Sequence, residues 1–188
     1  MSGISKKFSL LQHIRLDLAR MNALKGKQAI SKNPVRFWFG MLSPRYLPVF
    51  IYRISYYFHY RKIPILPRFA STINFLVFGI EITHQCYIGT GFYLPHTQGT
   101  VIGAYCLGKN VTVFQGVTLG AKEVDFVFAP ESRPRIGDNV TIGAGAKVLG
   151  GITIGSQANI GANAVVLESV PEGVLVVGVP SRVVKKIA

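Results

Sequence analysis

The sequence predicts a mainly β protein, a parallel β-helix that follows an α-helical segment. From residue 136 onward an aliphatic residue recurs every six positions without a slip, at Ile136, Ile142, Val148, Ile154, Ile160 and Val166. Two shorter runs with the same period precede it, at Ile82, Ile88 and Leu94, and at Leu107, Val113 and Leu119. Before residue 80 the period is absent, and apolar residues follow helical spacing instead.

The segment before the repeats, residues 1–79, predicts three helices. Apolar residues at i, i+3 and i+4 intervals predict a helix over about residues 8–25. Its apolar face consists of Leu10, Leu11, Ile14, Leu18 and Met21. A second helix, Val49–Tyr60, should end before the Pro64 and Pro67 pair, and a third, over about 67–78, should lead into Gly79.

From residue 80 to 188 the six-residue period predicts a coil. Six residues suffice for one short strand and one tight turn, so three repeats form a triangular coil with its aliphatic residues inward. Glycine follows the aliphatic residue at positions 137, 143, 155 and 161, and we expect these corners to need a strained or positive φ. Ordinary hairpins would need alternating apolar residues and irregularly spaced two-residue turns, which the sequence lacks.

The repeat loses its phase twice, and insertions in a solenoid commonly carry function. Leu94 to Leu107 spans 13 residues where two repeats need 12, so one extra residue should bulge there. The interval from Leu119 to Ile136 is longer and fits no whole number of repeats, and its polar, aperiodic stretch predicts an extended loop over a neighbouring face.

Composition excludes several classes of protein. With 188 residues, 49% hydrophobic and 15% charged, the chain is too apolar to be intrinsically disordered. Cys86 and Cys106 have no metal-binding spacing, so we expect two buried thiols rather than a disulfide or a metal site. The N-terminus lacks the apolar core of a signal peptide, and no window offers about 18 uncharged apolar residues. We therefore expect a cytoplasmic protein that does not span a membrane.

The net charge of +13 belongs to one end of the chain. Residues 1–80 carry 13 Lys and Arg against the single acid Asp17, a net of +12, whereas residues 81–188 carry 8 against 7, a net of +1. No nucleic-acid motif holds these cations, so we expect no nucleic-acid partner. Cations interleaved with aromatic rings predict a peripheral surface for anionic lipid. They are Arg53, Arg61, Lys62 and Arg68, with Tyr52, Tyr56, Tyr57, Phe58 and Tyr60. The alternative is that the rings pack between helices and the cations are simply solvated.

His96, in the first phase break, is the candidate general base. Glu81 precedes it by nearly one coil of three repeats, so the two side chains are expected on adjacent coils. A carboxylate at one imidazole nitrogen fixes the tautomer, and the other nitrogen can then remove a proton from a hydroxyl. A purely structural histidine is the alternative, and His84 in the first coil is a rival.

Several stretches carry a specific resemblance: GIEITHQCYIGTGFYLPHTQGTVIG, FQGVTLGA, IGDNVTIGAGAKVLGGITIG, IGANAVVL and VVGVPSRVV. Over about residues 79–188 they resemble the hexapeptide-repeat acyltransferases of the serine O-acetyltransferase type. The resemblance implies a left-handed parallel β-helix and a homotrimer or dimer of trimers. It also implies acetyl transfer from acetyl-CoA to a hydroxyl, with no metal.

By this resemblance, His96 matches the general base and Glu81 the acid that orients it. The backbone amide of Gly120 or Ala121 matches the donor to the oxyanion. The positions that match donor-binding residues are Ala144 and Ala162, along the pantetheine chain, and Arg182 and Lys185, at the phosphates. For the two alanines the alternative is that the corners are merely tight.

The acceptor-binding positions depart from those of serine-specific members. Pro95 stands where an Asp usually precedes the catalytic His, and Ser132-Arg133-Pro134 replaces Arg-His-Pro. The acidic residue usual in the N-terminal helices is replaced around Asn22. The partner for the ammonium group of serine is thus lost, and Arg133 only partly replaces the clamp for its carboxylate.

We therefore expect an O-acetyltransferase that acts on a sugar hydroxyl in surface polysaccharide biosynthesis. A lipid-linked sugar would meet the basic segment, residues 1–79, at the inner face of the membrane. The alternative is serine O-acetyltransferase, which makes O-acetylserine for cysteine biosynthesis. A third hypothesis is a non-catalytic β-helix that binds or scaffolds.

Overall fold

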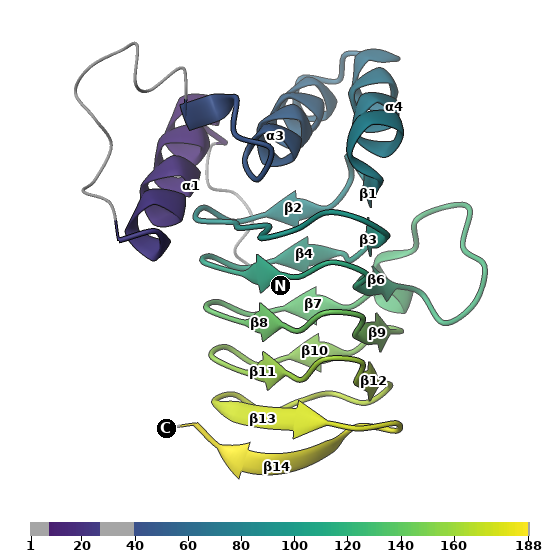
Figure 1. Ribbon diagram of the computed structural model, residues 1–188. Coiled ribbons are helices and arrows are strands. Elements are labelled where there is room, and N and C mark those ends of the chain that lie inside the picture. The colour runs from purple at the N-terminus through teal and green to yellow at the C-terminus, as the bar shows by residue number, and fades with distance from the viewer. Residues whose placement is uncertain (1–7, 27–39, 188) are drawn as a thin grey trace.

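The computed structural model describes residues 8–26 and 40–187, in which three α-helices stack on one end of a three-sided parallel β-helix (Figure 1). The helical elements are α1 (Leu10–Leu24), α3 (Leu47–Tyr60), α4 (Leu66–Phe78) and a 3₁₀ turn over Pro130–Ser132. These bounds confirm the three helices predicted from the sequence to within two residues.

Successive coils add strands to three sheets. Sheet A has the order β1 (Ile80–Ile82), β3 (Thr100–Ile102), β6 (Thr118–Gly120), β9 (Lys147–Leu149) and β12 (Val165–Val166). Sheet B has the order β2 (Tyr87–Ile88), β4 (Cys106–Leu107), β7 (Arg135–Ile136) and β10 (Thr153–Ile154). Sheet C consists of β5 (Thr112–Val113), β8 (Thr141–Ile142), β11 (Asn159–Ile160), β13 (Val174–Val177) and the antiparallel β14 (Arg182–Lys186).

The six-residue repeat forms the core of the coil, as predicted. Every aliphatic side chain of the three runs is at most 3% exposed, and burying each one contributes about 1.5–3 kcal/mol. Arg135 pairs with Thr153 and Lys147 with Val165, so one regular coil consists of three repeats. Ile14, Leu18 and Met21 of α1 join the same core, whereas Leu11 is exposed.

The glycines after the aliphatic residues allow close stacking, and the predicted positive φ is wrong for them. None of Gly137, Gly143, Gly155 and Gly161 has a positive φ. A Cβ at Gly143 would lie 2.6 Å from the backbone nitrogen of Ala162 on the next coil. In each of these turns the residue with a positive φ comes three positions after the inward-pointing residue of the repeat. These residues are Asn110, Gly116, Asn139, Gly145, Gln157 and Asn163.

The first phase break changes the register of sheet A twice. A regular coil would pair Ile82 with Thr100, but Ile82 pairs with Ile102. Ile102 in turn pairs with Leu119, one position short of a regular coil. The predicted one-residue bulge is therefore an excess of two residues before β3 and a deficit of one after it.

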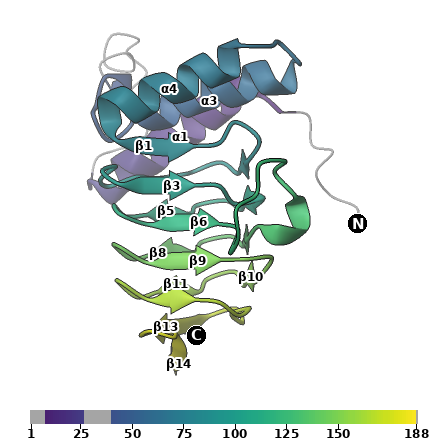
Figure 2. The same cartoon turned by 90° about the vertical axis from the view of Figure 1, so that its right-hand side faces the viewer.

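The second phase break is a loop, as predicted. A regular coil would pair Thr118 with Ile136, but Thr118 pairs with Lys147 of β9. The additional chain forms loop 121–134, which projects from the coil (Figure 2).

A buried ion pair joins the helices to the first coil. Arg53 Nε donates to Asp17 Oδ2 over 2.9 Å, and both side chains are 0% exposed. Arg53 also donates to the carbonyls of residues 88–89. The amides of residues 91–92 donate to Asp17 over 2.7 and 3.0 Å. The helical cap, residues 8–26 and 40–78, is thus bonded to the turn that follows β2.

This pair corrects the predicted lipid-facing surface. Arg53 is fully buried, and Tyr52 is 1% exposed and donates its hydroxyl to the Cys86 carbonyl over 2.6 Å. The half-buried members of the predicted set are Tyr56, Tyr57 and Phe58, and the exposed ones are Tyr60, Arg61, Lys62 and Arg68. In the described part of the chain, no helix has the length and apolar character needed to cross a bilayer.

Candidate functional site

The predicted site residues lie along two corners of sheet A. The His96 corner consists of the turns that lead from sheet C into sheet A or, at the last coil, into β14: residues 95–99, 114–117, 143–146, 161–164 and 178–181. The loop corner lies at the other end of the sheet A strands and carries loop 121–134. Figure 2 shows β1, β3, β6 and β9 stacked, with this loop at one side.

The His96 corner aligns His96 with Ala144, Ala162 and Arg182. Backbone hydrogen bonds of 2.8–3.0 Å join its successive turns, and Arg182 begins β14 directly after the last turn. With about 4.8 Å between adjacent strands, the five strand spacings from the His96 turn to β14 make the row about 24 Å long. Lys185 lies farther along β14, opposite Leu175.

Most of the predicted residues along this row are accessible to a ligand. His96, Ala162, Arg182 and Lys185 are exposed, and Ala144 is half-buried. Two alanines between an exposed imidazole and exposed cations leave room for an extended, polar-ended molecule to lie against the corner. The tight stacking of the neighbouring glycines also accounts for small residues here, so both interpretations of the alanines stand.

Glu81 lies between the two corners, at the centre of β1, with its side chain outward. Its strand partner is Val101, because the first coil is two residues longer than a regular one. Among the described residues, no hydrogen bond or ion pair links Glu81 to His96. Both side chains are exposed on adjoining parts of the surface, and the dyad stays a prediction.

Gly120 and Ala121 lie at the loop corner. Gly120 ends β6, and a Cβ there would meet no atom within 4 Å, so the surface beside it is open. Ala121 lines a cavity of about 470 Å³ between loop 121–134 and Gly150–Gly151. In one chain these residues are separated from His96 by the width of sheet A.

Arg133 is held within the loop. Its Nε donates to Asp125 Oδ2 over 2.9 Å, its Nη1 donates to the Gly103 carbonyl over 2.7 Å, and the guanidinium lies 4.2 Å from the Phe128 ring centre. Desolvation raises the pKa of Asp125, but hydrogen bonds from the Ala129 amide and from Arg133 lower it more. Arg133 therefore shapes the loop, and its free capacity to bind a carboxylate is reduced.

Pro95 and His84 complete the predicted set. Pro95 is half-buried in the same turn as His96, where it offers no charge to an ammonium group. His84 follows β1 at the loop corner, and its ring centre lies 5.0 Å from that of His59. The structure thus places the two candidate histidines at opposite ends of sheet A.

Neither cysteine thiol is an activated nucleophile. Cys86 is buried and Cys106 half-buried, both are free, and burial raises the pKa of each. Within residues 8–26 and 40–187, no three His, Cys, Asp or Glu side chains are grouped to hold a metal ion.

Sequence analysis missed Asp17 and Arg53 as positioning residues. The available signal was that Asp17 is the only acid before position 81.

Comparison with known proteins finds one family and many similar chains. Residues 133–168 match the bacterial transferase hexapeptide family (six repeats). A serine acetyltransferase of Staphylococcus xylosus is 45% identical over 139 residues, which are 73% of this chain and 63% of that protein. The chain thus spans less than two thirds of that relative.

Two solved structures are similar over nearly the whole chain. The Neisseria gonorrhoeae serine acetyltransferase in complex with serine has a TM-score of 0.77 and 30% identity, covering 94% of this chain and 69% of that one. The Brucella abortus serine acetyltransferase in complex with coenzyme A has a TM-score of 0.77 and 26% identity, covering 95% and 68%. The fold is the left-handed parallel β-helix.

Proposed function

The chain belongs to the hexapeptide-repeat acyltransferases of the serine acetyltransferase type, and on this premise we propose that it is an acetyl-CoA-dependent O-acetyltransferase. The observation that carries the proposal is the His96 corner, where an exposed imidazole, two small residues and an exposed cation form one row. Acetyl-CoA would lie along this row, with Arg182 and Lys185 meeting its phosphates.

In the proposed reaction His96 removes the proton of the acceptor hydroxyl, and Glu81 orients the imidazole. The hydroxyl oxygen attacks the thioester carbonyl carbon, the C–S bond breaks, and the coenzyme A thiolate leaves with the proton from His96. An amide at Gly120 or Ala121 stabilises the oxyanion. Open space beside Gly120 supports this role.

We also propose a homotrimer or a dimer of trimers. In one chain the His96 corner and the loop corner lie at opposite ends of sheet A. A cyclic arrangement of three-sided prisms would bring the loop corner of one protomer against the His96 corner of the next. His96 and the Gly120 amide would then face one acceptor from two chains.

L-serine is the first candidate acceptor, supported by the names of the relatives and by the serine complex of the Neisseria gonorrhoeae enzyme. A sugar hydroxyl is the second. Pro95 in place of an acid and the engagement of Arg133 with Asp125 favour it, because both changes weaken a site for an amino acid. We further propose that the helical cap meets a membrane peripherally, at its inner face.

Purified protein with acetyl-CoA tests the chemistry. The amount of free thiol released is compared between L-serine, nucleotide sugars and lipid-linked sugars, and the compound that gives release is the acceptor. We expect His96→Ala to lower turnover about 10²–10⁴-fold without changing the melting temperature. His84→Ala is the matched comparison, since a loss there instead would move the base to the loop corner. No thiol release with any of these acceptors would overturn the proposal.

A further inference from the structure

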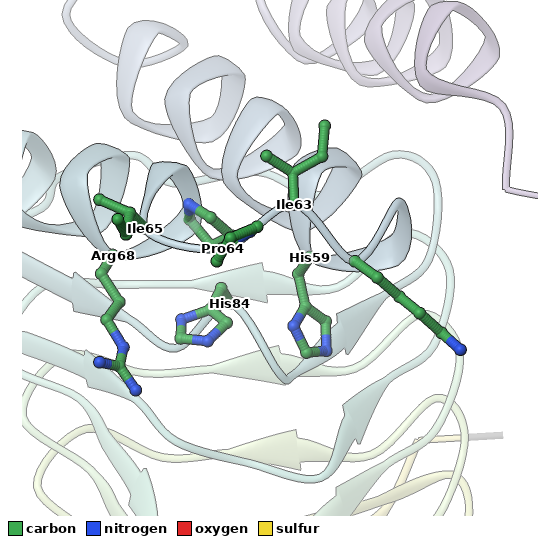
Figure 3. A pocket seen from close by; sticks show the side chains of 8 residues that line it. His59, Ile63, Pro64, Ile65, Arg68 and His84 are labelled. Carbon is green, nitrogen blue, oxygen red and sulfur yellow. The ribbon is translucent and has the colours of Figure 1, made fainter.

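A cavity of about 390 Å³ opens where the end of α3, the start of α4 and the turn after β1 meet. Its basic lining residues are His59, Lys62, Arg68 and His84, and the other lining residues are Ile63, Pro64, Ile65 and Pro67. Figure 3 shows the two imidazoles side by side, with the Arg68 side chain extending toward the same side of the 63–65 loop. None of these described lining residues is acidic.

Within the part of the chain that the structure describes, the basic side chains of this cavity have no counterion. Among the described residues, none of the four side chains takes part in an ion pair. Burial lowers the pKa of His59 and of His84, and for His84 the nearby His59 and Arg68 lower it further. An anion in the cavity would relieve this mutual repulsion. The geometry and charge therefore favour a negatively charged group.

The adjoining helix carries its large apolar side chains on the solvent side. Ile65, Phe69 and Leu76 lie along one face, including the residue just before α4, and are 77%, 63% and 74% exposed. The opposite face buries Pro67, Ala70 and Asn74. An exposed apolar face of this kind marks an interaction site. Because Ile65 also lines the cavity, the apolar face and the basic cavity form one surface.

We propose that this cavity binds the phosphate of an anionic lipid headgroup while the exposed face of α4 settles at the boundary with the acyl chains. A lipid supplies both chemistries at once, and the net charge of +12 over residues 1–80 complements an anionic membrane. Packing this surface symmetrically against a second copy would instead oppose Arg61, Lys62 and Arg68 of two chains. The inference rests on the peripheral placement proposed above and is independent of acetyl transfer.

Vesicle flotation tests the lipid proposal. Binding to vesicles of equimolar phosphatidylcholine and phosphatidylglycerol is compared with binding to vesicles of phosphatidylcholine alone. We expect binding to the anionic vesicles only. Lys62→Gln with Arg68→Gln should lower the partition coefficient about 30-fold, about fivefold for each cation. Phe69→Ser with Leu76→Ser should also abolish binding. The matched control, Lys109→Gln with Lys186→Gln, removes the same charge from exposed sites on the coil and should change binding less than about twofold.

Other interpretations are outcomes of the same experiment. If the cavity binds inorganic phosphate but the protein does not bind vesicles, the cavity is a site for a free anion, and the lipid proposal is overturned. Vesicle binding unchanged by Phe69→Ser with Leu76→Ser, together with a smaller particle mass by light scattering, would assign the face to a protein interface. Circular dichroism checks that each variant folds, and Arg68→Lys, which keeps the charge, should retain binding. Thiol release by the same variants keeps a failure of docking distinct from a failure of catalysis.

The imidazoles give a second readout. Bound phosphate favours their protonated form, so binding should strengthen as pH falls through the range below 6.5, the ordinary pKa of histidine. The groups that face the two rings are Lys62, Arg68 and Tyr56. His59→Gln with His84→Gln should remove this pH dependence. A dependence that persists in that variant would contradict the placement of the phosphate.

Discussion

Replacing Asp17 by Asn tests the ion pair between the cap and the first coil. Asn has nearly the same shape, so no cavity forms, but Arg53 keeps its charge where both side chains are 0% exposed. Removing one partner of a buried pair costs about 3–5 kcal/mol. We expect Asp17→Asn to lower the free energy of unfolding by that amount, a large part of the roughly 5–15 kcal/mol of an ordinary domain.

The double variant Asp17→Leu with Arg53→Met makes the test sharper. Apolar replacement of a buried ion pair is often neutral or stabilising. Here the pair also serves four backbone groups, the carbonyls of residues 88–89 and the amides of residues 91–92. Each group left unsatisfied costs about 1–3 kcal/mol. We therefore expect the double variant to stay destabilised by about 4 kcal/mol or more.

Urea unfolding followed by circular dichroism, at one protomer concentration, measures both effects. Glu168→Gln, at an exposed acid, is the control and should change stability by less than about 0.5 kcal/mol. Hydrogen exchange at the amides of residues 91–92 should speed up in both Asp17 variants. A double variant as stable as the parent chain would refute the argument that these backbone groups depend on the pair.

Two further predictions follow from the coil and the histidines. Gly143→Ala should lower the free energy of unfolding by about 1–3 kcal/mol, because its Cβ would lie 2.6 Å from the Ala162 nitrogen. Gly120→Ala would place its Cβ in open space beside the proposed oxyanion donor, so it should keep the melting temperature and lower turnover. Equal melting temperatures for the two would contradict the stacking argument. Burial lowers the pKa of His13, His59 and His84 below 6.5, so the unfolded chain binds more protons in acid. The free energy of unfolding should stay constant above pH 6.5 and fall as the pH drops below it. In His13→Gln the fall with pH should be less steep. Urea unfolding at a series of pH values checks this, and a free energy that does not change with pH would contradict it.

The coil could be predicted because its signal is local and periodic, but the role of its glycines could not. A six-residue spacing of buried aliphatic residues is visible in any stretch of the sequence. How closely two coils approach is not, and the 2.6 Å distance at Gly143 depends on Ala162 in the next coil. The sequence shows only that glycine recurs, and a positive φ was the wrong reason for it.

The candidate site could be proposed from the sequence in part for a similar reason, and it stays a prediction. His96 was identified because it lies where the period breaks. Its relation to Glu81 depends on the length of the first coil. The sequence predicts one extra residue there, and only the strand register shows that this coil is two residues longer than a regular one. Arg53 resembled the surface cations around it, and only the fold brings Asp17, from a different helix, against it.

The first coil explains why buried charge lies at this position. Every interior coil has a neighbour on both sides, but the first coil has only one, so one edge of its backbone would be left without partners. The cap takes the place of the missing coil through Asp17 and Arg53, and Arg20 Nη1 donates to the carbonyls of Gly91 and Val111. Two cations of the basic segment thus serve to close the coil that carries Glu81 and His96. Within residues 8–26 and 40–187, the exposed Lys62 and Arg68 beside the cavity between α3 and α4 take part in no ion pair, which is why we assign them to a ligand.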